Sequence, residues 1–185
     1  MMFDWLKKKT ENARATASII PPPPQPARGF SRTKYDPNLI IHLKDDHQEL
    51  LGIYKSIMQS LDQQNYKPHM QGLDKQIFDS VNDLLSEFGT ALKSHLLKEH
   101  VELYIYLEQL LAKDRHAYDL MHSLRLEMDE ISAGVMGFLN TYHATPISAQ
   151  NVDIFRRDFK KIGQVLASRI KREEDSLYPL YANTF

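Results

Sequence analysis

Residues 92–107 read LKSHLLKEHVELYIYL, and residues 166–181 read LASRIKREEDSLYPLY. The two stretches align at an offset of 74 residues. The matched pairs are Leu92 with Leu166, Ser94 with Ser168, His95 with Arg169, Glu99 with Glu173, Leu103 with Leu177, and Tyr104 with Tyr178. The segments before them align as well, since Asp46–Tyr54 set against Glu127–Val135 places Met128 opposite His47. The repeat indicates a duplicated helical hairpin.

Four long segments carry apolar residues at helical spacing, and we predict helices over about residues 37–63, 71–112, 115–142 and 149–181. Apolar residues recur in steps of three and four, as in Met121, Leu124, Met128, Ile131, Val135, Phe138 and Tyr142. Near its end the second stripe passes through Tyr106 and Leu110, and the fourth passes through Leu177 and Leu180. No segment alternates with the period of two that strands show, so the sequence predicts an all-α, up-down-up-down four-helix bundle.

The N-terminal part differs in composition from the rest of the chain. Five of the nine prolines lie between Pro21 and Pro26, and such a run favours a polyproline II spacer. Residues 1–35 carry a net charge of +5, against −6 for the remainder. We therefore predict a flexible basic segment with a Pro-rich linker over 1–35 and the bundle over 36–185. Asp36, which precedes Pro37, is expected to cap the first helix.

Composition excludes several classes of function. The 185 residues contain no cysteine, which excludes disulfides, iron–sulfur clusters and thiolate zinc sites. Seven glycines form no phosphate-binding loop. No apolar run is long enough to cross a bilayer and no secretory signal is visible, so we expect a cytoplasmic protein without a transmembrane segment. An acidic bundle also argues against nucleic-acid binding.

Five ionisable side chains lie on the inward stripes where a purely structural bundle would carry apolar residues. They are His47, His95, Glu99, Arg169 and Glu173. Burying such groups is costly unless they pair with one another or bind a metal ion. Residues four positions apart lie one turn apart on the same helical face, so the His95 imidazole and the Glu99 carboxylate are expected to converge on one centre.

This pattern resembles the hemerythrin-like HHE cation-binding domain over about residues 36–182. The residues that carry the resemblance are His47, the run from His95 through Glu99 and His100 to Tyr104, and the run from Arg169 through Glu173 and Glu174 to Tyr178 and Pro179. The resemblance implies a bundle that holds two non-haem irons, with histidines as terminal ligands and the two glutamates as bridges. Imidazole and carboxylate are ligands that iron accepts.

The second half of the chain departs from that pattern. Arg169 and Met128 stand where the family pattern has histidines. His116 and His122 lie on the same predicted helix as Met128, but both fall off the inward stripe. The candidate metal ligands are therefore His47, His95, Glu99 and Glu173.

Two functions of different classes follow. The first is a hemerythrin-like protein that senses or carries oxygen, nitric oxide or iron through a mono- or dinuclear iron site; a single iron would be held by His47, His95 and Glu99. The second is a metal-free interaction module for a protein partner, in which Arg169 pairs with Glu99 and Glu173; this reading loosely resembles the anti-sigma regulators of bacterial RNA polymerase. No nucleophile beside a general base is apparent, so we do not expect an enzyme.

Overall fold

The computed structural model describes residues 34–62 and 73–182, and within them every regular element is helical. The elements are α2 (Leu39–Ser60), α3 (Leu73–Lys98), η1 (Glu99–Tyr104), α4 (Ile105–Leu110), η2 (Leu111–Lys113), α5 (Arg115–Ala144), α6 (Val152–Arg172), η3 (Glu173–Leu177) and α7 (Tyr178–Ala182). The predicted segment 1–35, with its Pro-rich linker, lies almost wholly outside the described residues.

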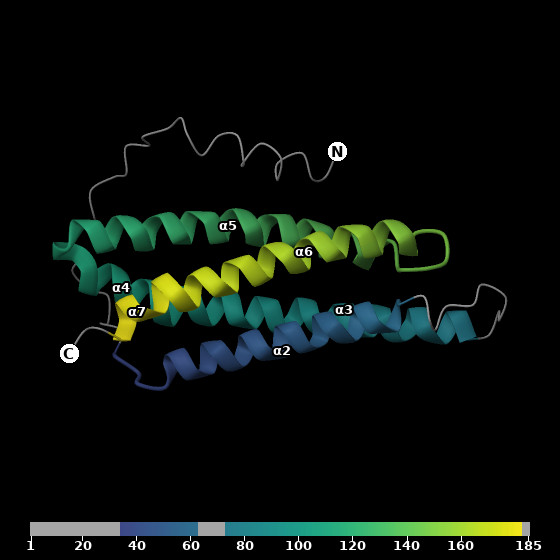
Figure 1. Cartoon of the computed structure of the whole chain (residues 1–185), viewed down its shortest axis with the longest axis horizontal. Coiled ribbons are helices and arrows are strands. Elements are labelled where there is room, and N and C mark those ends of the chain that lie inside the picture. The colour runs from purple at the N-terminus through teal and green to yellow at the C-terminus, as the bar shows by residue number, and fades with distance from the viewer. Residues whose placement is uncertain (1–33, 63–72, 183–185) are drawn as a thin grey trace, which may run out of the picture.

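The helices form four rods that run lengthwise along the molecule (Figure 1). The second rod is α3 continued by η1 and α4, and the fourth is α6 continued by η3 and α7. The packed pairs are α2 with α3, α3 with α5, α5 with α6, and α6 with α2, so each rod contacts two neighbours around a common core. The predicted all-α four-helix bundle is confirmed.

The helix ends differ from the predicted ones by a few residues. The first helix begins at Leu39, two residues later than predicted, with Asn38 as the N-terminal flanking residue. Asp36 is not that residue, but its Oδ1 accepts a hydrogen bond from the Asn38 N–H at 2.9 Å. The Asp36 carboxylate therefore stabilises the turn that leads into the helix.

Two π-helical segments start 74 residues apart, one at Glu99 and one at Glu173. A π turn accommodates an extra residue, which rotates the inward face of everything after it. The prediction that Leu110 lies on the inward stripe is therefore wrong: Leu107 is fully buried, whereas Leu110 is 37% exposed. Tyr106 is half-buried and packs against the edge of the core. Each π segment thus marks the same point of the duplicated hairpin.

The fourth rod shows the same one-residue shift. Leu177 is buried as predicted, but Tyr181 and not Leu180 continues the buried face. The π turn also brings two successive residues, Leu177 and Tyr178, into the core. Tyr178 can therefore face the interior beside its apolar neighbour.

The apolar core consists of two clusters with a polar layer between them. One cluster includes Leu50, Phe88, Leu92, Ile131, Phe159 and Leu166, and the other includes Leu43, Leu103, Tyr104, Leu124 and Leu177. Along every rod a short segment separates the residues of one cluster from those of the other. On three rods the inward positions of this segment carry the ionisable residues of the stripes. Burial of the large apolar side chains, about 1.5–3 kcal/mol each, holds the polar layer in place.

Candidate metal centre

The residues of the polar layer come from three of the four rods. His47 comes from α2, His95 from the end of α3, Glu99 from the first position of η1, Arg169 from the end of α6, and Glu173 from the first position of η3. All five are at most 3% exposed. They lie on the same inward stripes as their apolar neighbours. The helical periodicity that buries the core therefore also points these side chains toward one another.

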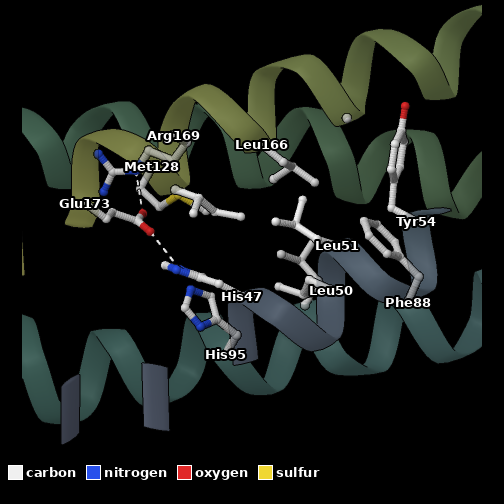
Figure 2. A pocket seen from close by; sticks show the side chains of 13 residues that line it. His47, Leu50, Leu51, Tyr54, Phe88, His95, Met128, Leu166, Arg169 and Glu173 are labelled. Atoms are coloured by element: carbon white, nitrogen blue, oxygen red, sulfur yellow. Dashed lines mark ion pairs between the residues drawn. The ribbon is translucent and has the colours of Figure 1, made fainter. Parts of the chain in front are cut away.

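Three of the four predicted ligands converge. Among the described residues, a ligand atom from each of His47, His95 and Glu173 lies within 4.8 Å of the other two. The His47 Nε2 lies 3.1 Å from Glu173 Oε2, and the two imidazole rings are 4.7 Å apart between centroids. Figure 2 shows the Glu173 carboxylate pointing from its helix toward the His47 ring, with the His95 ring beside it. We call this group the His–His–Glu cluster.

Glu99 is buried beside the cluster but is not one of its three members. Its Oε1 is buried without a hydrogen-bond partner. Burial and the nearby Glu173 carboxylate raise the pKa of Glu99 well above its usual range, and the attraction of Arg169 opposes this only in part. The neutral, protonated form of Glu99 is therefore favoured in the metal-free protein.

Arg169 occupies the side of the layer opposite the imidazoles. Its Nε lies 2.6 Å from Glu173 Oε1, and its guanidinium donates a hydrogen bond to the Tyr104 hydroxyl at 2.8 Å. With Glu99 it interacts only at longer range. The expected carboxylate–guanidinium–carboxylate arrangement is thus present as one close pair, Arg169 with Glu173.

Two further carboxylates face the outer nitrogens of the imidazoles. Glu174 Oε1 lies 3.0 Å from His47 Nδ1, and Asp46 Oδ2 lies 3.5 Å from His95 Nδ1. Neither carboxylate was among the predicted site residues, although Glu174 belongs to a run that carries the family resemblance. The available signal was position, since Asp46 and Glu174 are chain neighbours of His47 and Glu173.

Met128 lines the same small cavity as the cluster and Arg169, as its place opposite His47 in the repeat predicts. The cavity has a volume of about 20 Å³, enough for a water-sized molecule. Its other walls are mostly apolar, and its far end lies at Tyr54 (Figure 2); Gly163 also lines the cavity. A Cβ atom at Gly163 would lie 2.2 Å from the Tyr54 ring, so glycine is what lets this ring close that end.

The remaining histidines of the described chain lie away from the cluster. His116 is exposed, and His122 is half-buried with its ring stacked on Tyr118 at 6.0 Å between centroids. His42, His100 and His143 are exposed. His69 lies outside the described residues. The structure therefore places Met128, and not His122, at the site.

The two imidazoles differ in their electrostatic surroundings. Burial alone would lower the pKa of His47, but its hydrogen bonds to Glu173 and Glu174 raise it above the ordinary value. Burial lowers the pKa of His95, and the neighbouring His47 lowers it further. Of the two imidazoles, His47 is therefore the one whose doubly protonated form is favoured, with a glutamate facing each nitrogen.

We expect the metal-free protein to lose stability as the pH rises above 6.5. Glu99 and His47 have raised pKa values in the folded state, so their contributions are lost as the pH rises through those values. His95, whose pKa is lowered, acts in the opposite sense only at lower pH. Each group contributes at most about 1.4 kcal/mol per pH unit. Urea unfolding with a chelator present, at several pH values, measures the slope.

Glu99→Gln should make that slope shallower, because the amide has no proton to lose. Glu102→Gln, a change of an exposed carboxylate one turn away, is the matched control and should leave the slope as it is. An unchanged slope in Glu99→Gln would show that Glu99 is ionised in the folded state.

A four-helix bundle with a buried imidazole–carboxylate cluster between its rods has the architecture of a helical metal-binding protein. The sequence of the chain matches the model of the hemerythrin HHE cation-binding domain over residues 38–181. The chain therefore belongs to the hemerythrin HHE cation-binding domain family. No curated protein and no solved structure gives a significant match. Within the described residues, no helix has the length and apolar character needed to cross a membrane.

Proposed function

We propose that this chain binds one divalent cation, preferably iron, through His47, His95 and Glu173. The observation that carries the proposal is the convergence of these three side chains, all buried, within 4.8 Å of one another. Two imidazoles and one carboxylate form a ligand set that iron accepts. A bound iron would offer open coordination positions to a small ligand such as oxygen or nitric oxide.

The buried carboxylate oxygens of the layer support a bound cation. Glu99 Oε1 is buried without a hydrogen-bond partner, and Glu173 Oε1 has no aligned hydrogen bond beside its ion pair with Arg169. Buried polar atoms without partners are costly, and a cation between the carboxylates would satisfy the oxygens. A cation also replaces the proton on His47, so its binding should release protons and weaken as the pH falls.

The proposal is for one ion and not two because of Arg169. Its guanidinium is paired with Glu173 on the side of the layer where the family pattern has a second set of histidines. Two unit positive charges about 4 Å apart repel by about 4 kcal/mol at an effective dielectric constant near 20. Met128, the other departure, supplies a thioether, which is a poor ligand for a hard ferric ion.

We propose a binding role for the site, without catalysis. The hydroxyl groups nearest the cluster belong to Tyr104 and Tyr178, which contact Arg169 and His47. Burial and neighbouring carboxylates raise the pKa of both phenols far above the ordinary value, so neither is a ready nucleophile. The role that fits is to sense, carry or store the ion or a small ligand on it.

The close pair of Arg169 with Glu173 also favours the second hypothesis, a metal-free module for a protein partner. In that case the guanidinium and the His47 imidazole compensate the buried carboxylates without a metal ion. Metal content decides between the two, because the metal-free module requires none.

The decisive measurement is the stoichiometry and affinity of ferrous iron in anaerobic titrations. We expect about one ion per chain, and we expect Glu173→Gln to weaken binding by more than about 100-fold, beyond the 10- to 100-fold typical of a residue that only supports a ligand. Glu99→Gln, the matched change in the other half of the repeat, should alter the affinity by less than about 10-fold. Circular dichroism establishes that both variants fold.

If Glu99→Gln weakened iron binding more than Glu173→Gln, the carboxylate ligand would be Glu99, as the sequence predicts for a single iron. A wild-type protein that is folded and takes up no iron, zinc or manganese would contradict the proposed function. It would favour the metal-free module.

A further inference from the structure

Each imidazole of the His–His–Glu cluster is backed by a carboxylate, and each of these carboxylates is backed by a lysine. On one side, His47 Nδ1 lies 3.0 Å from Glu174, whose other oxygen lies 3.9 Å from Lys44 Nζ. On the other side, His95 Nδ1 lies 3.5 Å from Asp46, to which Lys98 Nζ donates at 2.7 and 2.9 Å. Both series run from the buried centre to the surface.

The burial of these groups falls off in the same order on both sides. The imidazole side chains are 1% and 3% exposed, those of Glu174 and Asp46 are 30% and 20% exposed, and those of Lys44 and Lys98 are 49% and 29% exposed. Each carboxylate therefore has one edge in contact with a buried ring and the other near water and an ammonium group. A carboxylate in this position accepts hydrogen bonds from both sides and donates none.

The connections run between helices. Glu174 follows Glu173 in η3 but contacts His47 of α2, and Asp46 precedes His47 in α2 but contacts His95 of α3. Each of these carboxylates is thus a chain neighbour of one cluster residue and contacts the imidazole of another cluster residue on a different rod. The three rods are linked in the order η3, α2, α3 by contacts that do not need a metal ion.

We propose that Glu174 and Asp46 are positioning residues that hold the Nδ1–H of His47 and His95, so that Nε2 of each ring is the nitrogen presented to a cation. An imidazole that donates from one nitrogen keeps the lone pair on the other, and the acceptor also fixes the plane of the ring. The metal part of this inference rests on the proposed function. The orientation of His95 by Asp46 can be tested without any metal.

The distances rank the two positioning residues. Glu174 approaches His47 closely and Lys44 distantly, whereas Asp46 is held by Lys98 at both oxygens and is farther from His95. Loss of the Glu174 carboxylate should therefore have the larger effect on the affinity for a cation.

The test uses the full chain, with zinc as a diamagnetic probe. Glu174→Ala and Asp46→Ala are each expected to raise the zinc dissociation constant by about 10- to 100-fold. The exposed chain neighbours Asp175 and Asp45 provide the controls Asp175→Ala and Asp45→Ala, which should change it by less than about twofold. Glu174→Gln and Asp46→Asn retain an acceptor oxygen and should recover part of the loss.

Nitrogen-15 NMR of the imidazoles separates positioning from a general effect of charge. In the metal-free protein, at a pH where His95 is neutral, we expect its proton on Nδ1, and Asp46→Ala should shift the tautomer population toward Nε2–H. In the zinc-loaded protein both rings should show a protected Nδ1–H, which Glu174→Ala should expose to exchange for His47.

The outcomes distinguish this inference from the proposed function. A metal-free protein with the His95 proton on Nε2, or alanine variants that weaken zinc binding with unchanged tautomers, would overturn the positioning role. If the His95 tautomer depends on Asp46 but the wild-type protein binds no metal, the proposed function fails while the role of Asp46 in orienting the ring is retained.

Discussion

Replacing Arg169 by methionine should cost the metal-free protein about 3–5 kcal/mol of unfolding free energy, the usual loss when one partner of a buried ion pair is removed. Arg169 is 2% exposed and is the cation next to Glu173. Without it, Glu173 and Glu99 are two buried carboxyl groups with no compensating guanidinium. A buried carboxylate is costly in its charged form, so the loss should grow as the pH rises. Urea unfolding with a chelator present measures it.

Arg157→Met is the matched control for this loss. The Arg157 side chain is 63% exposed, and its partner Asp158 retains a second contact with Lys161 at 3.2 Å. We expect this change to leave the unfolding free energy almost unchanged, as for exposed ion pairs. Adding a divalent metal ion should recover part of the stability of Arg169→Met, because a ligand that binds only the folded state stabilises it. Equal small losses in both variants would mean that Arg169 does not compensate a buried charge.

The fold was predictable up to the π segments. Apolar spacing in threes and fours identifies each rod, and the repeat identifies the pairing of the two halves. The rotation after Glu99 was not predictable, because every residue from Leu103 to Leu107 is apolar. In such a run any register places apolar side chains inward, so spacing cannot show that Leu107 and not Tyr106 continues the buried face.

The buried members of the site were predictable for the opposite reason. His47, His95 and Arg169 are conspicuous because each interrupts an apolar stripe. Asp46 and Glu174 lie one position off those stripes, within acidic runs that are typical of a solvated face. Their role depends on which neighbouring rod they approach, which a single sequence does not contain.

The choice between Glu99 and Glu173 could not be made from spacing either. Both follow a site residue by four positions and both begin a π segment. The two halves are equivalent in pattern and differ only through Arg169. The guanidinium holds Glu173 while His47 approaches it from the other side, whereas Glu99 lacks a close partner.

Restoring the two missing histidines should create a second metal position. In the variant that combines Met128→His with Arg169→His, we expect ferrous iron uptake to rise from about one to about two ions per chain. Both altered residues line the cavity next to His47 and His95, so new imidazoles there would face the same layer. The change removes the buried positive charge that repels a second cation, and it frees Glu173 and Glu99 to bind both ions. Iron analysis and the near-ultraviolet absorption of the oxidised protein measure the result.

Two control variants show which residue limits the uptake of a second iron ion. Met128→His alone should stay near one ion, because the guanidinium remains in place. A displaced control combines Arg169→His with Met136→His, since Met136 lies on the same helix but packs against the apolar cluster away from the layer. It should not gain a second high-affinity ion. Without metal, the Met128→His and Arg169→His variant should be less stable than the wild type and should recover when iron is added, because two buried carboxyl groups then depend on the ions for compensation. A folded double variant that still takes up one ion would mean that Arg169 does not set the stoichiometry.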